Sequence, residues 1–174
     1  MHITPEPDSD RKYFFWLWPA ANQAGADDVV IWLNGGPGCS SVEGALQEIG
    51  PVVFPYQIIG LPKRDRVELN PYSWDRLATI VTVDQPIGTG FSSGTPTAKD
   101  CKDVAEQFYG FLVNLLDTFS ELKGKKLWRA GESFSIRYIS YIASKITPTK
   151  VSMQRTVSHS RASRSSTPFS PATF

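Results

Sequence analysis

The residues best suited to chemistry lie between positions 126 and 135, where an apolar run ends at Gly131 and Ser133 follows two positions later. Beyond Ser133 the apolar residues recur at helical spacing, which predicts a strand, a sharp turn and a helix. Such a nucleophile elbow exposes the serine hydroxyl, and the first amide of the helix faces the oxyanion that forms. A Gly-x-Ser sequence is also common at helix N-caps, so this stretch alone supports either interpretation.

A second candidate is the glycine-rich loop of residues 34–41, which joins an apolar run to a helical pattern. Phosphate-binding loops have the same placement, but a P-loop lysine is absent and Pro37 removes one of the amides that would hold a phosphate. A rigid loop that offers one backbone N–H to an oxyanion fits better, because glycine permits close approach. Two cysteines without a C-x-x-C motif argue against a metal or redox site, and we expect no cofactor.

Three further side chains have two interpretations each. Glu132 directly precedes the serine, where a carboxylate opposes an acyl-transfer transition state unless it is turned away, protonated or engaged in binding. It also suits the N-terminus of a helix. Glu48 lies at the edge of an apolar helical stripe, where a solvated surface acid is the simpler interpretation. Cys39 has no candidate base nearby, so we expect it to be buried or part of a disulfide.

The elements that would position these residues alternate along the chain. Apolar runs predict strands at residues 13–18, 29–33, 79–83 and 126–131, with short strands around Val53 and Val67, and helical periodicity covers residues 42–49, 100–122 and 138–146. This alternation indicates an α/β fold with a mostly parallel central sheet. Because active-site loops follow the carboxyl ends of such strands, the loops 34–41, 84–92 and 131–135 are expected to meet in space.

Composition limits the class of protein. The chain has 174 residues, 41% of them hydrophobic, and a net charge of +1, which predicts a globular domain and does not imply nucleic acid as a partner. We recognise no signal peptide and no apolar run of membrane-spanning length, so no membrane partner is expected. Residues 1–148 are assigned to the domain. The Ser-, Arg- and Pro-rich residues 149–174 are predicted to be disordered, with a phosphorylated or nucleic-acid-binding tail and non-native coding sequence as alternatives.

Five sequence blocks, taken together, resemble the serine carboxypeptidase family of the α/β-hydrolase fold. They are Trp-Leu-Asn-Gly-Gly-Pro-Gly-Cys-Ser-Ser at 32–41, Glu-Ile-Gly-Pro at 48–51, Asn-Pro-Tyr-Ser-Trp at 70–74, Asp-Gln-Pro-Ile-Gly-Thr-Gly-Phe-Ser at 84–92 and Gly-Glu-Ser at 131–133. Their combination is far more specific than the elbow alone, and it covers roughly residues 12–143. The resemblance implies a partial α/β-hydrolase fold that is truncated after the nucleophile helix.

The resemblance also implies an activity, which is hydrolysis of the C-terminal peptide bond of a peptide or protein through an acyl-enzyme on Ser133. The amides of Gly36 and Phe134 match the oxyanion hole. The residues that match the group holding the substrate carboxylate are Asn34, Glu48 and Glu132. Two carboxyl groups bind a third only if protons are shared among them, which favours a mildly acidic working pH. Vacuolar, lysosomal or secreted localisation is implied, as is a disulfide from Cys39 to a downstream partner.

Departures from the family pattern concern the elbow and the rest of the catalytic triad. The family reads G-E-S-Y-[AG]-G, so Ile136 replaces a glycine, and we expect overpacking that costs about 1–3 kcal/mol. After Glu132 the sequence contains no Asp or Glu, and its only later histidine is His159; the other, His2, lies at the terminus. We therefore expect an amino-terminal portion with little or no activity of its own. The alternatives are a non-catalytic fragment that binds peptide C-termini and another α/β hydrolase such as an esterase.

Overall fold

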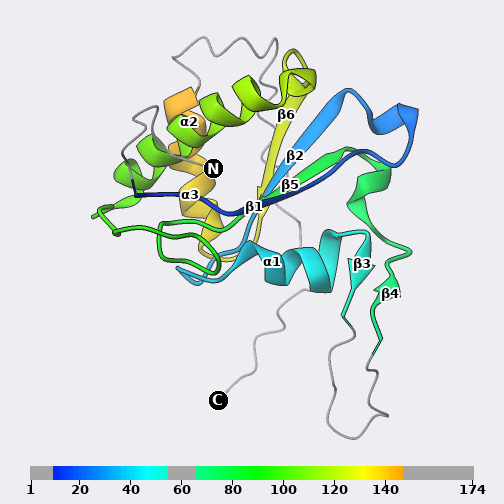
Figure 1. Ribbon diagram of the computed structural model, residues 1–174, viewed down its shortest axis with the longest axis horizontal. Helices are drawn as coiled ribbons and strands as arrows, with labels where there is room; N and C mark the ends of the chain where they lie inside the picture. Colours follow the sequence, from blue (N-terminus) through cyan, green and yellow to red (C-terminus); the bar gives the residue numbers. More distant parts are fainter. Residues whose placement is uncertain (1–9, 55–65, 147–174) are drawn as a thin grey trace, which may run out of the picture.

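The computed structural model describes residues 10–54 and 66–146, and Figure 1 shows a twisted sheet with helices on both faces. Its four strands are β1 (Phe15–Trp18), β2 (Asp28–Leu33), β5 (Thr79–Val83) and β6 (Lys126–Gly131). They lie in the order β1-β5-β2-β6, with β5, β2 and β6 parallel and β1 antiparallel to β5. The predicted α/β fold with a mostly parallel sheet is therefore confirmed.

One face of the sheet is covered by α2 (Cys101–Thr118) and α3 (Ser135–Ile146). Side chains alternate across a strand, so every second residue of β2 points into this core. The largest members of the core that these elements share are Tyr13, Ile31, Leu33, Phe108, Phe111, Leu115 and Ile142. Asp100 caps α2, because its carboxylate accepts hydrogen bonds from the amides of Lys102 and Asp103.

The opposite face carries a smaller cluster of Trp32, Ile49 and Ile80 beneath α1 (Ser41–Gly44). The predicted regular helix over residues 42–49 was wrong beyond Gly44, because the chain widens into a π-helical turn (Ala45–Ile49). Gly50 ends this turn by donating its amide to the carbonyl oxygen of Ala45 at 3.0 Å. The remaining strands, β3 (Val52–Val53) and β4 (Glu68–Leu69), form a separate antiparallel ladder.

Short 3₁₀ turns complete the described part, at Gln23–Gly25, Trp74–Arg76 and Ser120–Leu122. The last of these shows that the helix predicted to reach residue 122 ends at Thr118. No helix among the described residues is long and apolar enough to span a membrane. The predicted disorder of residues 149–174, and both histidines, lie outside the described residues.

Candidate active site

The serine that the sequence singles out lies on a sharp turn between β6 and α3. Ser133 has a φ of +53°, the one positive value outside glycine in the described residues, and its side chain is exposed. Such a conformation costs free energy for a residue with a Cβ and is found where the surrounding structure enforces it. Gly131 permits the turn, because a Cβ there would collide with the carbonyl oxygen of Leu33 and lie 2.5 Å from Ser135 Oγ. These features are those of a nucleophile elbow.

The glycine-rich loop packs directly against this elbow. A Cβ added to Gly35 would lie 2.5 Å from the backbone nitrogen of Phe134 and 3.1 Å from the Cβ of Ser133. The next residue, Gly36, has a φ of +101°, which glycine adopts without strain. Among the described residues neither Gly36 nor Phe134 donates its backbone amide to a hydrogen bond. Two unpaired amides therefore lie on the two segments that meet beside Ser133.

Asn34 connects the end of β2 to the residue that precedes the serine. Its side chain is 2% exposed; its Oδ1 accepts a hydrogen bond from Trp32 Nε1 at 2.7 Å, and its Nδ2 donates to Glu132 Oε1 at 3.1 Å. The indole thus fixes the orientation of the amide, and the amide engages the Glu132 carboxylate. Gly44 leaves the necessary room, since a Cβ there would lie 2.5 Å from Asn34 Oδ1.

Glu48 belongs to the π-helical turn Ala45–Ile49. Partial burial raises the pKa of its carboxyl group, and the negative charges of Glu132 and Glu43 raise it further. Glu48 and Glu132 are therefore electrostatically coupled although they are 84 positions apart. The structure brings Asn34 and Glu132 into contact and places Glu48 close enough to Glu132 for the charge of Glu132 to raise its pKa.

Asp84 is a site residue that the sequence analysis missed. Its carboxylate is fully buried at the end of β5, where Oδ1 accepts hydrogen bonds from Ser40 Oγ and from the Ser41 amide, both at 2.7 Å. Oδ2 accepts the amide of Phe91 at 2.9 Å. Ser41 Oγ in turn accepts the amide of Asn34 at 3.0 Å. Asp84 therefore ties the loop 34–41 to the loop 84–92 and holds the chain that carries Asn34.

The expected meeting of three loops is confirmed by these contacts. Asp84 joins the first loop to the second, and Gly35 packs the first against the elbow. The sequence signal for Asp84 was its position, an acid directly after a five-residue buried strand and before a Gln-Pro pair. An acid at the end of a strand that a loop covers is shielded from water, so its carboxylate accepts hydrogen bonds from backbone amides.

Of two expectations about neighbouring residues, the crowding by Ile136 was wrong, and for Cys39 burial was wrong while a disulfide remains a prediction. Cys39 is exposed and unpaired in the described part of the chain, because the loop that carries it turns outward after Gly36. The disulfide implied by the resemblance stays a prediction. Ile136 does not crowd the elbow, because its side chain is 65% exposed on the outer face of α3.

The triad that would activate Ser133 is incomplete in the region that the structure describes. Residues 10–54 and 66–146 contain no histidine, and Ser133 Oγ has no hydrogen-bond partner among them. Within the same residues no cluster of His, Cys, Asp and Glu could hold a metal ion. The elbow thus offers a nucleophile and two amides without a proton acceptor.

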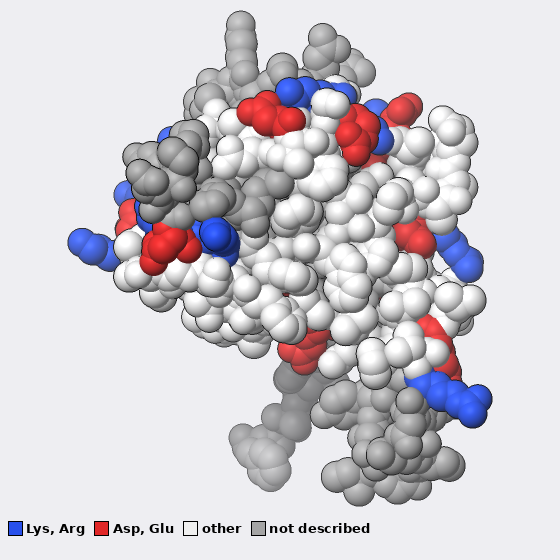
Figure 2. Space-filling view, in the orientation of Figure 1, with Lys and Arg blue, Asp and Glu red and all other residues white. Residues whose placement is uncertain are grey.

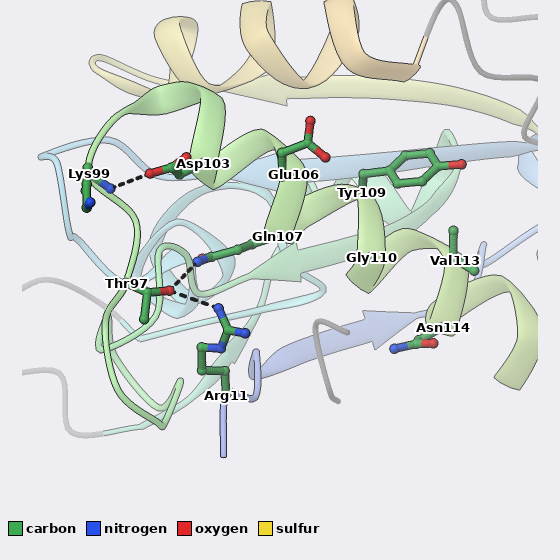
Figure 3. A pocket seen from close by; sticks show the side chains of 10 residues that line it. All are labelled: Arg11, Thr97, Lys99, Asp103, Glu106, Gln107, Tyr109, Gly110, Val113 and Asn114. Carbon is green, nitrogen blue, oxygen red and sulfur yellow. Dashed lines mark hydrogen bonds between the residues drawn. The ribbon is translucent and has the colours of Figure 1, made fainter. Parts of the chain in front are cut away.

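A hollow of about 800 Å³ lies elsewhere, beside α2 (Figure 3). There Arg11 and Gln107 both donate hydrogen bonds to Thr97 Oγ1, at 2.9 and 3.1 Å. The hollow carries charges of both signs, and Figure 2 likewise shows acidic and basic groups interspersed around an uncharged centre. We assign it no role in the chemistry at Ser133.

The parallel sheet, the elbow and the packed glycine loop define the class as an α/β-hydrolase fold. The chain belongs to the serine carboxypeptidase family, whose model matches residues 2–158. A probable serine carboxypeptidase from Arthroderma benhamiae is 44% identical over 82% of the chain, which spans 28% of that protein. A pheromone-processing carboxypeptidase from Aspergillus terreus is 41% identical over 83% of the chain, which spans 22% of it.

A solved structure shows the same fold. The crystal structure of a prohormone-processing carboxypeptidase from Saccharomyces cerevisiae matches with a TM-score of 0.73 and 33% sequence identity. The match covers 85% of this chain and 33% of the yeast chain. The chain therefore spans about a fifth to a third of the length of the proteins to which it is similar.

Proposed function

We propose that the fold to which this chain contributes is a serine carboxypeptidase, which releases C-terminal amino acids through an acyl-enzyme on Ser133. The observation that carries the proposal is the Asn34–Glu132 hydrogen bond directly beside the elbow, with Glu48 coupled to it. Membership of the family supports the reaction class. An esterase has no use for an amide and two acids grouped in this way, which counts against that alternative.

The substrate of this site is a peptide with a free C-terminal carboxylate. Asn34 Nδ2 donates to such a group, and a protonated Glu48 supplies a second donor. Because the pKa of Glu48 is raised, it keeps its proton to a higher pH than an ordinary glutamic acid, and substrate affinity rises as the solution becomes mildly acidic. This dependence suits a vacuolar, lysosomal or secreted protein.

Chemistry would proceed by attack of Ser133 Oγ on the last peptide carbonyl, with the amides of Gly36 and Phe134 donating to the oxyanion. A base must take the hydroxyl proton, and the described residues supply none. We therefore propose that the 174-residue chain binds peptide C-termini and turns them over slowly or not at all.

Calorimetric titration at pH 5 with an N-blocked dipeptide, as the free acid and as the amide, tests the binding site. We expect the acid to bind about tenfold tighter, and Asn34→Ala and Glu132→Gln to remove this preference. Glu121→Gln, which changes an exposed acid on a remote turn, is the control and should preserve it. Equal affinities for acid and amide in the unaltered chain would refute the carboxylate site.

Turnover of the same dipeptide distinguishes the enzyme from a binding fragment. We expect no release of the terminal amino acid above the level of the Ser133→Ala variant. Turnover that depends on Ser133 and matches that of an intact family member would show that the chain contains its own base, and the proposed inactivity would then be wrong.

A further inference from the structure

Glu43 is an acid near the carboxylate-binding residues that the proposed reaction does not use. It lies in α1 directly before Gly44, and a Cβ added to Gly44 would lie 2.5 Å from Asn34 Oδ1. The side chain of Glu43 is exposed, and its negative charge raises the pKa of Glu48. Glu43 is therefore within electrostatic range of the site, although it takes no part in the hydrogen bond between Asn34 and Glu132.

The helix α1 and the π-helical turn that follows it place Glu48 and Glu43 in two neighbouring rows. Residues four positions apart share one flank of a helix, so Glu48 lies one turn beyond Gly44, on the flank that packs against Asn34. Glu43 and Gln47 are also four positions apart, and both are exposed. The row of Glu43 and Gln47 therefore borders the carboxylate-binding residues on the side that faces solvent.

The charge around Glu43 is unbalanced. The carboxylates of Glu43 and Glu132 both act on Glu48, and none of the three acids forms an ion pair within residues 10–54 and 66–146. A bound substrate carboxylate adds a fourth acidic group. Shared protons relieve the repulsion among this group, Glu48 and Glu132, but they leave the charge of Glu43 in place. A positive group on the substrate would offset that charge.

The side chain of a bound C-terminal residue begins at the Cα that carries the carboxylate, so it starts beside the residues that hold this carboxylate. Toward the sheet the space is closed, because Trp32 and Asn34 are buried there. Away from the sheet it opens along the exposed row of Glu43 and Gln47. A long terminal side chain that extends in this direction passes Glu43.

We propose that Glu43 makes the site selective for peptides that end in a basic residue, lysine or arginine. The inference rests on the proposed function, because the carboxylate held by Asn34 and Glu132 fixes where the terminal side chain begins. Lysine carries its ammonium group on a flexible four-carbon stem, and the guanidinium of arginine pairs with a carboxylate through two hydrogen bonds. A neutral terminal residue forms no such pair, and an acidic one is repelled by Glu43.

The test uses N-blocked dipeptides that differ only in their last residue, which is lysine, norleucine or glutamic acid. Norleucine has the stem of lysine without the ammonium group. In calorimetric titrations of the 174-residue chain at pH 5, we expect the lysine peptide to bind about fivefold tighter than the norleucine peptide. The glutamic acid peptide should bind most weakly. Equal affinities for the lysine and norleucine peptides would overturn the inference.

Variants assign the preference to one side chain. Glu43→Gln should bring the ratio of the lysine and norleucine affinities to about one, and Glu43→Lys should make the glutamic acid peptide the tightest of the three. Glu121→Gln, at an exposed acid on a remote turn, is the control and should leave the order unchanged. A preference for lysine that survives in Glu43→Gln would show that another group causes it.

The norleucine dipeptide, as the free acid and as the amide, separates this inference from the proposed function. If the acid binds tighter than the amide but lysine has no advantage over norleucine, selectivity by Glu43 fails and the carboxylate site stands. If the amide binds as tightly as the acid, the carboxylate site fails and the inference fails with it.

Discussion

Two charged side chains of the central sheet, Asp84 beside β5 and Arg129 in β6, have opposite surroundings. Asp84, at the end of β5, is fully buried and accepts three hydrogen bonds from two loops. Arg129, in β6, is partly buried, and its Nη1 has no hydrogen-bond acceptor among the described residues. A buried charge is tolerated when its hydrogen bonds are made, and otherwise its burial costs stability.

The two regions differ in how completely their polar groups are hydrogen-bonded within the described residues. Hydrogen bonds of Asp84 and Ser41 tie the loop 34–41 to the loop 84–92 and hold the backbone of Asn34. Within residues 10–54 and 66–146, β6 pairs with a strand on one side only, and Nη1 of Arg129 has no hydrogen-bond acceptor. The two regions should therefore respond differently to substitution.

The largest effect is expected at Asp84. Asp84→Ala leaves three donors of the site loops without their acceptor, and we expect the free energy of unfolding to fall by about 3 kcal/mol or more. Urea denaturation measures this change in the free energy of unfolding. Asp117→Ala, at an exposed acid that pairs with Lys123, is the control and should change the value by less than about 0.5 kcal/mol. If Asp84→Ala lowers the free energy of unfolding no more than Asp117→Ala does, the hydrogen bonds of Asp84 do not stabilise the site loops as the comparison requires.

Gly35→Ala should have the next largest effect. The new Cβ would lie 2.5 Å from the Phe134 nitrogen, so the loop and the elbow must separate, at a cost of about 1–3 kcal/mol. Because that separation moves the glycine loop away from Ser133, we also expect weaker binding of the dipeptide acid. Unchanged stability together with unchanged binding would mean that the loop and the elbow are not packed together.

Arg129→Leu should change stability in the opposite direction. Replacing a partly buried, unpaired cation with an apolar side chain should stabilise the isolated chain by roughly 1 kcal/mol, after allowance for its partial exposure. Thermal denaturation detects the shift, with Arg76→Leu as the exposed control. Destabilisation by Arg129→Leu would show that the guanidinium already has a partner.

The smallest effect concerns Glu48 and depends on pH. Because the folded-state pKa is raised, ionisation of Glu48 costs stability as the pH rises above the ordinary glutamate range. Glu48→Gln should therefore melt at a higher temperature than the unaltered chain at pH 7, and the two should converge near pH 4. If Glu48→Gln changes the melting temperature equally at pH 7 and pH 4, titration of Glu48 is not the cause of the change.

The fold was largely predictable because its signals are local. The runs at residues 29–33 and 79–83 are apolar enough to be strands buried on both faces, and both are β-strands in the structure. The position of the elbow followed from Gly131 and Ser133. The π-helical turn was not predictable, because Val42, Ala45, Leu46 and Ile49 fit α-helical spacing and only the bond from Gly50 to Ala45 reveals the wider turn.

The site was predictable only in part, because its geometry is non-local. Considered alone, Glu48 suggested a surface acid and Glu132 an acid at a helix N-terminus. Both are exposed, and their electrostatic coupling depends on the fold that brings them together. The role of Asp84 depends on amides in two other segments, which no local pattern contains. Ile136 was expected to crowd the elbow and is exposed, because packing around a residue cannot be read from its type alone.

The most direct measurement is a crystal structure of this chain at pH 5 with the N-blocked dipeptide acid bound. We predict that the C-terminal carboxylate will contact Asn34 Nδ2 and the carboxyl groups of Glu48 and Glu132, with the last peptide carbonyl facing the amides of Gly36 and Phe134. A carboxylate bound anywhere else, such as the hollow beside Arg11 in Figure 3, would contradict the account.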